Sequence, residues 1–264
     1  MAQLWLIGGT QESGQLARAI AARGLPCIVT VTTETAIALY PVASSLTVQV
    51  TRFTPESLAE FLTTQAIAGI LDASHPFAVE ISQQAIAAAQ PFQIPYLRFE
   101  RPALPTSPDC PMETVPTVAD LLRGDRLAGE RVLLILGYRS LALFQPWQAR
   151  ATLFARILPS TTALTAAIAA GFTPDRLIAL RPPLSLALEQ ALWQHWHISL
   201  VVTKASGDAG GEAIKRQVAA ALGIPLVTIA RPAMTYPQQT SDLEVAVAFG
   251  DRCLDAPAPA IHPD

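Results

Sequence analysis

The sequence predicts an α/β fold made of two Rossmann-like parallel-sheet domains with a cleft between them. Short apolar runs alternate with longer amphipathic segments from one end of the 264 residues to the other. This alternation is typical of parallel strands joined by crossover helices. A proline-rich stretch near the middle interrupts the pattern, which then resumes in the same order. Because 51% of the residues are hydrophobic and only 15% are charged, the chain can bury two cores and is not disordered.

The first half of the chain predicts five strands and three helices. We expect strands near residues 3–8, 26–32, 46–51, 68–72 and 94–98, and helices near residues 11–23, 54–64 and 76–90. Gly24 is placed to end the first helix, and Thr54 and Pro55 are a typical cap and first residue for the second. Residues 1–101 are therefore expected to form the first domain, which we assign to the cofactor.

The second half repeats this organisation after a proline-rich linker, which we place at residues 102–116. We expect strands near residues 131–137, 151–157, 176–180, 198–203 and 225–230, and helices near residues 159–170, 184–196, 209–222 and 240–249. Residues 117–250 are therefore expected to form the second Rossmann-like domain. The tail over residues 251–264, which ends in "DAPAPAIHPD", is expected to be disordered.

Charge and cysteine usage exclude several classes of function. The net charge is −3 and no basic tract is present, which argues against nucleic acid as a partner. The start "MAQLWLIGGT" has no charged leader region and is broken by glycines, so neither a signal peptide nor a membrane span is expected. The three cysteines are isolated, so no zinc or other metal site is expected. We predict a cytoplasmic protein, either a monomer or a small homo-oligomer.

The first candidate loop is "LIGGTQESG", residues 6–14, where a strand meets a helix. Glycines at Gly8 and Gly9, followed by Thr10 and Glu12, let backbone N–H groups approach a phosphate at the helix N-terminus. The loop is neither G-x-G-x-x-G nor a P-loop. A tight turn that only shapes the fold is the alternative interpretation.

The second candidate loop is "GILDASHPFAVEIS", residues 69–82. Asp72 ends a strand and Pro76 fits the first position of a helix, which leaves Ser74 or His75 to cap that helix. Ser74 suits the capping role. Histidine is a mediocre cap, and an imidazole at a strand end can donate to a ligand or carry a proton. His75 is therefore our candidate catalytic residue.

The third candidate loop is "VVTKASGDAGG", residues 201–211, which repeats the first loop in the second half. Lys204, Ser206, Gly207 and Gly211 surround a predicted helix N-terminus and form a candidate anion nest. A flexible turn with a solvated lysine is the alternative. Further cations follow other strand ends, namely Arg98 and Arg101 in "PYLRFERP" and Arg139 in "LGYRSL". These can meet carboxylates, although Arg98 can also form a surface pair with Glu100.

Three pieces, "GGTQES", "DASHPFA" with "YLRFERP", and "TKASGDAGG", together resemble the precorrin-6A reductase family of cobalamin biosynthesis. The resemblance implies an NADPH-dependent oxidoreductase of the class that acts on CH–CH groups, which reduces a ring double bond of precorrin-6A, or of its cobalt form, a tetrapyrrole precursor of the corrin ring. With it, the candidate cofactor-binding residues are Gly8, Gly9, Thr10, Glu12, Thr32 and Ser74. The candidate substrate-binding residues are Arg98, Arg101, Arg139, Lys204, Ser206, Gly207 and Gly211.

The choice of cofactor rests on the resemblance alone. The second strand is followed by Thr32, Thr33 and Glu34, which suit NADH and NADPH equally. The chain also departs from the family, with Ala205 where relatives usually have an acid and "RPPLS" at residues 181–185 where they tend to have G-P-F-S. Two other classes of function stay open: a nucleotide-sensing binding protein without catalysis, and a methyltransferase that uses the Gly8–Gly9 loop.

Overall fold

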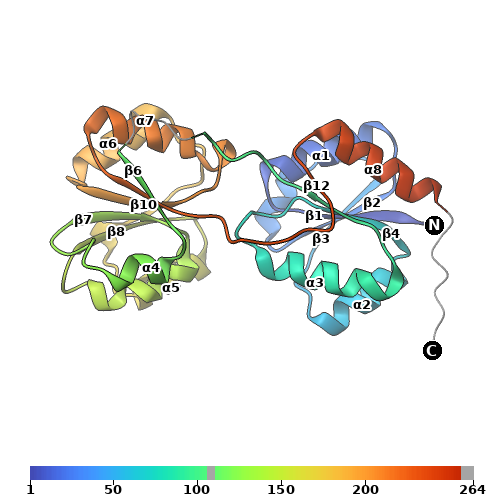
Figure 1. The fold of residues 1–264 in the computed structure, drawn as a ribbon, viewed down its shortest axis with the longest axis horizontal. Helices are drawn as coiled ribbons and strands as arrows, with labels where there is room; N and C mark the ends of the chain where they lie inside the picture. The colour runs from blue at the N-terminus through green and yellow to red at the C-terminus, as the bar shows by residue number, and fades with distance from the viewer. Residues whose placement is uncertain (106–110, 257–264) are drawn as a thin grey trace. The chain divides into compact units, whose positions relative to one another are not determined.

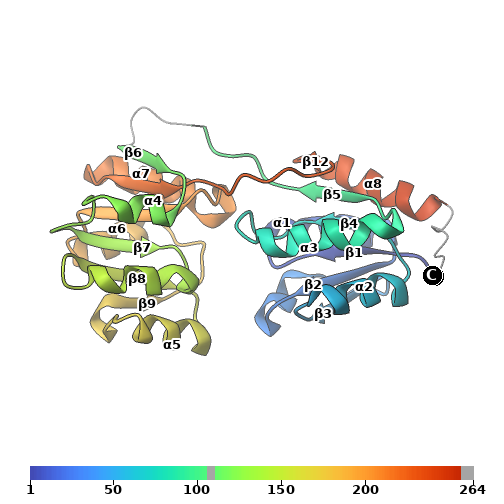
Figure 2. The ribbon, with the colours of Figure 1, turned by 60° about the horizontal axis from the view of Figure 1, so that its bottom comes forward.

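A computed structural model of the chain describes residues 1–105 and 111–256. These residues form two compact units (Figure 1, Figure 2). Unit 1 combines Met1–Pro102 with the segment that starts at Ala233, and unit 2 is Ala103–Pro232. Each unit contains one six-stranded sheet, and all paired strands run parallel. The predicted α/β class and the two parallel-sheet domains are therefore confirmed, whereas the cleft between them stays a prediction.

The sheet of unit 1 has the strand order β12-β5-β4-β1-β2-β3. Its strands are β1 (Gln3–Ile7), β2 (Cys27–Val31), β3 (Leu46–Val50), β4 (Ile67–Asp72), β5 (Tyr96–Phe99) and β12 (Gln239–Thr240). Its helices are α1 (Gln11–Ala22), α2 (Pro55–Thr64), α3 (Val79–Ala89) and α8 (Leu243–Asp255), with short 3-10 helices η1 (Glu34–Leu39) and η2 (Gln90–Phe92). Figure 1 shows α1 and α8 over one face of the sheet and α2 and α3 over the other.

Alternating apolar residues in β1 explain why both faces of this sheet are covered. Leu4 and Leu6 belong to the core formed with α1 and α8, whereas Trp5 and Ile7 belong to the core formed with α2 and α3. All four side chains are buried. Strands buried on both faces are typical of parallel sheets with crossover helices. Only the ends of the strands are therefore left for a ligand.

The sheet of unit 2 has the strand order β6-β11-β10-β7-β8-β9. Its strands are β6 (Met112–Val115), β7 (Arg131–Ile135), β8 (Thr152–Ile157), β9 (Leu177–Ala179), β10 (Leu200–Lys204) and β11 (Leu226–Ile229). Its helices are α4 (Val118–Arg123), α5 (Thr161–Ala169), α6 (Leu186–His195) and α7 (Glu212–Leu222), with 3-10 helices η3 (Tyr138–Trp147), η4 (Pro174–Arg176) and η5 (Asp208–Gly210). In Figure 1, α6 and α7 lie over one face and α4 and α5 over the other.

The chain follows the same path through both sheets. Apart from the edge strands β6 and β12, it begins at a central strand (β1 or β7), moves outward through two strands (β2 and β3, or β8 and β9), and returns to the other side of the first strand (β4 and β5, or β10 and β11). The strand order therefore reverses between β1 and β4 in unit 1, and between β7 and β10 in unit 2. Open α/β sheets bind ligands at the carboxyl ends of the strands beside such a reversal.

The segments that connect the units differ from the predicted linker. β6 lies inside residues 102–116, yet it pairs with β11 at the edge of the second sheet. β12 follows β11 in the chain and pairs with β5 of the first sheet. The linker prediction is therefore wrong for Met112–Val115, because backbone pairing at a sheet edge satisfies N–H and C=O groups that a free linker leaves to water. Residues 106–110 lie outside the described residues.

The last helix belongs to unit 1, which corrects the prediction that residues 117–250 form one domain. Ala246, Val247 and Phe249 of α8 are buried in the core of unit 1 beside α1 and β1. The helix also continues to Asp255, so the first part of the predicted disordered tail is helical. Residues 257–264 of that tail lie outside the described part of the chain.

Most helix ends agree with the predicted signals, and one does not. Thr54 caps α2 with Pro55 at its first position, and Gly24 follows α1 with a φ of +68°, as expected. Pro76, however, lies in a turn that precedes α3, and the helix begins only at Val79. Within residues 1–105 and 111–256, no helix has the length and apolarity needed to cross a bilayer.

Candidate functional site

The turn between β1 and α1 brings the backbone of Gly9 to the surface. Gly9 has a φ of +102°, and no atom lies within 4 Å of the place where a Cβ would be. Its N–H donates to the Tyr40 hydroxyl at 2.7 Å. Gly8 is closed in, because a Cβ there would come within 2.2 Å of the same hydroxyl. Gly8 therefore serves the packing, whereas Gly9 leaves open space beside the start of α1.

The first turn of α1 presents backbone donors at this open space. Thr10 caps the helix by accepting from the Ser13 N–H at 3.0 Å, and its hydroxyl donates to the Ala73 carbonyl at 2.7 Å. Among the described residues, the N–H groups of Gln11 and Glu12 have no hydrogen-bond acceptor. Such unpaired donors, together with the helix dipole, favour an anion.

Glu12 and Arg101 form an ion pair that joins the β1–α1 loop to the residues after β5. Glu12 Oε1 lies 2.8 Å from Arg101 Nη1, and both side chains are mostly buried. The other carboxylate oxygen, Oε2, is buried and has no partner within the described residues. This pairing partly neutralises the carboxylate that stands in the first turn of α1, next to the open backbone donors.

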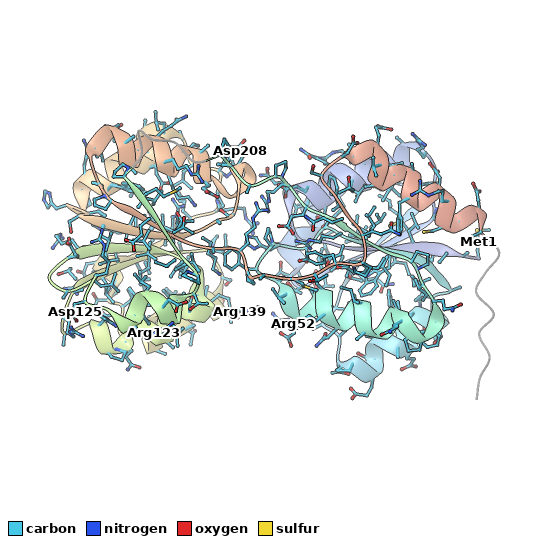
Figure 3. All side chains as sticks on the ribbon, viewed as in Figure 1. Met1, Arg52, Arg123, Asp125, Arg139 and Asp208 are labelled. Carbon is cyan, nitrogen blue, oxygen red and sulfur yellow. The ribbon has the colours of Figure 1, made fainter. Side chains whose placement is uncertain are left out.

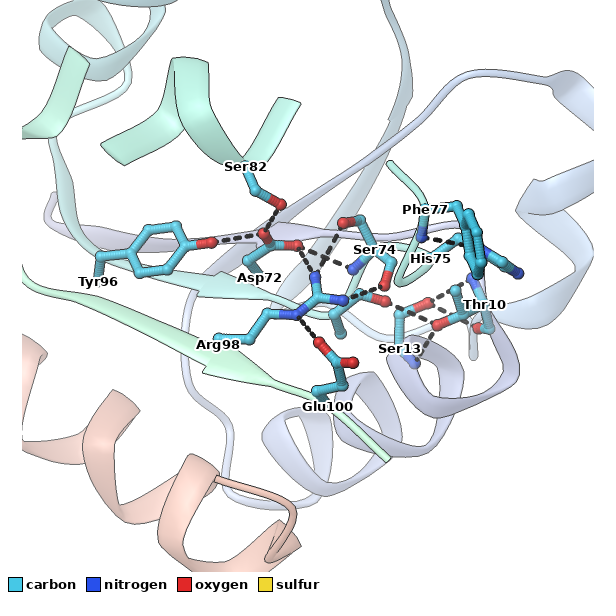
Figure 4. Close-up of polar contacts among 11 residues, drawn as sticks. Thr10, Ser13, Asp72, Ser74, His75, Phe77, Ser82, Tyr96, Arg98 and Glu100 are labelled. Atoms are coloured by element: carbon cyan, nitrogen blue, oxygen red, sulfur yellow. Dashed lines mark hydrogen bonds and ion pairs between the residues drawn. The ribbon is translucent and has the colours of Figure 1, made fainter. Parts of the chain in front are cut away.

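Asp72, at the end of β4, is the centre of a buried hydrogen-bond network (Figure 4). Its carboxylate has 0% exposure and accepts from Ser82 Oγ and the Tyr96 hydroxyl. It also accepts from Arg98 Nη1 at 2.8 Å and from the Ser74 N–H at 2.9 Å. Burial, followed by the charge of Asp72, raises the pKa of Tyr96. Four donors therefore compensate one buried carboxylate.

The structure assigns Arg98 a different position from the substrate-facing one predicted. Its side chain is 1% exposed and ion-paired with both Asp72 and Glu100. It also donates to the hydroxyl and to the carbonyl oxygen of Ser74, each at 3.0 Å, and packs against the Tyr236 ring. All three guanidinium nitrogens are thus used inside the protein. Arg98 positions the β4–α3 loop instead of facing a substrate.

Ser74 and His75 occupy a turn and do not cap α3, which corrects the predicted cap. Ser74 is buried and held by Arg98 and Asp72. His75 is exposed and opens a β-turn that the Ala78 N–H closes onto the His75 carbonyl at 2.7 Å. Proline is favoured at the second position of such turns, so Pro76 serves the turn and not the helix. His75 is therefore placed outward at a strand end by a rigid support.

The hydrogen bond at His75 also assigns the tautomer of its ring. Nδ1 accepts from the Phe77 N–H at 3.2 Å (Figure 4). In a neutral imidazole that accepts through Nδ1, the proton is on Nε2. Protonating Nδ1 would set two donors against each other and break this bond. With this bond in place, the ring N–H of His75 that can donate is Nε2–H.

Thr32 is exposed directly after the end of β2, next to β1 in the sheet. Its position agrees with a contact to the ribose half of a dinucleotide. In all, the carboxyl end of the first sheet gathers nine predicted site residues: Gly8, Gly9, Thr10, Glu12, Thr32, Ser74, His75, Arg98 and Arg101.

The reversal point of the second sheet carries two neighbouring cations. Lys204 ends β10 and is half-buried, and Arg139 follows the adjacent strand β7 and is exposed (Figure 3). Burial lowers the pKa of Lys204, and the charge of Arg139 lowers it further. Like charges held close together gain free energy when an anion binds between them.

The loop after Lys204 is built differently from the predicted anion nest. The Gly207 N–H donates to Glu212 Oε2 at 2.7 Å, and the Gly211 N–H donates to the Asp208 carbonyl at 2.7 Å. The Ser206 N–H is likewise used, by the Lys204 carbonyl. Since these N–H groups are satisfied internally, the backbone of Ser206, Gly207 and Gly211 shapes the loop, and the anion-binding groups that remain are side chains.

A comparison with known protein families decides the classification. The family model described as precorrin-6x reductase CbiJ/CobK matches residues 3–250. The chain belongs to this family. The family covers both units, so the resemblance stated from the three sequence pieces is confirmed, and the protein is a reductase.

Individual members of the precorrin-6x reductase family match over nearly the full length. The cobalt-precorrin-6A reductase of Synechocystis sp. is 51% identical over 257 residues, which cover 96% of this chain and 98% of that protein. The precorrin-6A reductase of Rhodobacter capsulatus is 29% identical over 236 residues, 89% of this chain and 90% of that protein. The solved structure of CobK precorrin-6A reductase is 27% identical, with a TM-score of 0.78 and coverage of 98% and 99%.

Several residues that build the candidate site of this family member were not predicted. Tyr40 and Tyr96 support the first two loops through their hydroxyls. Glu212 and Lys215 brace the third loop, because Lys215 Nζ donates to the Gly210 carbonyl at 3.1 Å while Glu212 holds Gly207. The signal for the last two was present: Glu212 and Lys215 are spaced i, i+3 on a predicted helix, so they share a face. The tyrosines carried no such signal.

Proposed function

We propose that this protein uses NADPH to reduce a ring double bond of precorrin-6A, or of its cobalt form, to the dihydro product in cobalamin biosynthesis. Family membership supports the reaction, and no feature of the site opposes it. One relative named for the cobalt substrate is 51% identical, whereas relatives that are 29–33% identical carry either name. This difference supports the cobalt form as the preferred substrate. We further propose a cytoplasmic location, where NADPH is available.

The open turn at Gly9 is the observation that carries the NADPH proposal. The free space beside Gly9 and the unpaired N–H groups of Gln11 and Glu12 fit the diphosphate of a dinucleotide. Thr32, one strand further along the sheet, fits the adenosine side. When bound there, NADPH supplies a hydride to one carbon of the ring double bond. The residues of unit 1 hold the cofactor and fix its direction.

His75 is proposed to contact the macrocycle beside the nicotinamide. The turn that carries it is fixed by the buried network of Asp72 and Arg98. An imidazole with a proton on Nε2 donates a hydrogen bond and polarises the ring. A proton from His75 or from water joins the neighbouring ring carbon. His75 thus orients and polarises the substrate.

Arg139 and Lys204 are proposed to bind a carboxylate of the tetrapyrrole, whose rim carries acetate and propionate groups. The lowered pKa of Lys204 reflects burial and a neighbouring cation. A carboxylate bound to both side chains would relieve that repulsion and gain charge-assisted hydrogen bonds. Arg101 is a further candidate for such a contact in unit 1, next to Glu12.

One assay tests this proposal against its alternatives. The purified protein is mixed under anaerobic conditions with NADPH and either precorrin-6A or cobalt-precorrin-6A, and absorbance follows both the cofactor and the macrocycle. We expect both spectra to change with equal stoichiometry. Binding of NADPH without its oxidation would favour a nucleotide-sensing protein. Transfer of a methyl group from S-adenosylmethionine to the macrocycle would favour a methyltransferase.

A further inference from the structure

Arg52 is an unpaired guanidinium at the carboxyl end of β3. It is exposed and, in the described part of the chain, takes part in no hydrogen bond or ion pair. Several other arginines of unit 1, such as Arg23 and Arg101, are ion-paired. Figure 3 shows Arg52 at the end of unit 1 where α3 begins. That is the end of the sheet at which Gly9 and His75 also lie.

The register of the sheet places Arg52 beside the end of β2. Val31 is opposite Val50, and the Thr51 N–H still donates to the Val31 carbonyl at 2.9 Å. The two chains therefore leave the sheet side by side. Continuing the register sets Arg52 opposite Thr33, with Thr32 opposite Thr51. Strand pairing thus places the Arg52 guanidinium beside Thr33, whose hydroxyl lies 3.3 Å from that of Thr35, with Thr32 one residue earlier in the chain.

The residues at this place suit a phosphate better than a ribose diol. Enzymes that prefer NADH usually end the second strand with a carboxylate, which accepts from the ribose hydroxyls. Here β2 ends at Val31 and is followed by Thr32 and Thr33, while Glu34 already belongs to η1. A guanidinium binds a phosphate through two parallel hydrogen bonds, which an amine or amide does not reproduce.

The distance along the sheet also suits the adenosine half of the cofactor. β1, β2 and β3 are adjacent, and neighbouring strands lie about 4.8 Å apart. The backbone of Arg52 therefore lies about 10 Å from the Gly9 turn across the strand ends. Its side chain can reach the 2′ position of the adenosine ribose when the diphosphate occupies that turn. We propose that Arg52, with Thr32 and Thr33, binds the 2′-phosphate of NADPH and makes the enzyme prefer NADPH over NADH. This inference rests on the proposed use of a nicotinamide cofactor.

The test is the substitution Arg52→Gln, measured by calorimetric titration of the protein with NADPH and with NADH. Removing a charge-assisted hydrogen bond to a phosphate is expected to raise the Kd of NADPH at least about tenfold, with the Kd of NADH nearly unchanged. Arg252→Gln is the matched control, because Arg252 is also an exposed arginine of unit 1. It lies on α8 next to Cys253, which packs against Gly69 in the first half of β4. The substitution removes the same charge at the other end of the sheet and should leave both affinities unchanged.

The outcomes separate this inference from the proposed function. If the wild-type protein binds NADPH and Arg52→Gln keeps the same ratio of NADPH to NADH affinity, the role of Arg52 is wrong while the reductase proposal stands. If the wild-type protein binds neither dinucleotide, both are wrong. Equal weakening of both cofactors would also overturn the specificity role. Because Arg52 is exposed and unpaired, its replacement should leave the thermal midpoint within about 1 °C, which checks that folding is intact.

Discussion

At the scale of single residues, Asp72 explains why polar residues gather at the end of β4. The carboxylate is buried and must be compensated, and its four donors come from the following loop, α3 and β5. Arg98 supplies the opposite charge and also grips the loop backbone at Ser74. The hydrogen bonds that compensate the buried carboxylate therefore also fix the backbone of the two residues before Pro76.

Removing Arg98 is expected to destabilise the protein more than to weaken substrate binding. Arg98→Met leaves Asp72 buried without its cation, which costs about 3–5 kcal/mol in the free energy of unfolding. Urea denaturation measures this decrease. Arg101→Met is the comparison, because the Arg101 side chain is 12% exposed whereas that of Arg98 is 1% exposed. A stable Arg98→Met variant that changes only the KM for the tetrapyrrole would restore the substrate-binding role first predicted.

His75 is expected to act as a hydrogen-bond donor through Nε2. His75→Ala should lower kcat by less than about 100-fold, the lower limit typical of removing a general acid, with NADPH affinity nearly intact. His75→Gln should recover part of the activity, since an amide N–H can take the place of Nε2–H. The pH profile of kcat decides the point. If His75→Ala loses a limb that the wild type shows, His75 is the proton donor and the purely hydrogen-bonding role is wrong.

At the scale of elements, helix α7 holds the third loop through two buried side chains. Glu212 fixes the start of the loop at Gly207, and Lys215 fixes its end at Gly210. Both side chains are 2% exposed, and the buried pair of Arg156 and Glu189 lies close enough to act on Lys215. The inward-facing charged side chains of α7 thus hold the loop that follows Lys204, in place of the predicted anion nest of backbone N–H groups.

Lys215 gives this element a pH dependence of defined sign. Burial, followed by the charge of Arg156, lowers its pKa from 10.5 to about 8. Between these two values the unfolded chain binds more protons than the folded one, so this group makes the protein more stable as pH rises. From about pH 7.5 to about pH 9, the unfolding free energy should rise by about 1 kcal/mol relative to Lys215→Met. A constant difference in urea denaturation across this range would contradict the burial of a charged Lys215.

At the scale of the whole molecule, the two units are interlaced in sequence although each has its own core. Unit 1 is completed only by α8 and β12, which follow unit 2 in the chain. α8 covers one face of the sheet at β1 and β4, where Gly69 and Gly250 leave room for it: a Cβ on Gly250 would come within 2.8 Å of Leu4. The fold of the first hundred residues therefore depends on the last helix.

Phe249→Ala tests this dependence. Phe249 is 3% exposed in the core of unit 1, and truncating a buried phenylalanine side chain costs about 3–5 kcal/mol. Hydrogen exchange should show weakened protection in β1 and β4, far from the substitution in sequence. Val245→Ala, on the exposed side of the same helix, should cost less than about 1 kcal/mol. A decrease in protection confined to α8 would mean that unit 1 is stable without it.

The sequence by itself determined the class of fold, the order of the main elements and the places where ligands are expected to bind. These follow from local physics: apolar periodicity sets strand and helix, and glycine, proline and threonine mark the ends, as Thr54, Pro55 and Gly24 show. The family was also recognised from the sequence, through "DASHPFA" and "YLRFERP", the two pieces that contain Asp72 and Arg98.

Only the tertiary structure decided which of these residues face inward and which segments complete each sheet. Arg98 and Lys215 are long cations that a sequence places on a surface, yet buried carboxylates and carbonyls hold both inside. The sequences of β6 and α8 do not indicate which unit each element belongs to. β6 pairs at a sheet edge and α8 buries one face, and both depend on partners that are distant in the chain. Burial and interaction partners are set by the packing of the whole molecule, so no local sequence pattern determines them.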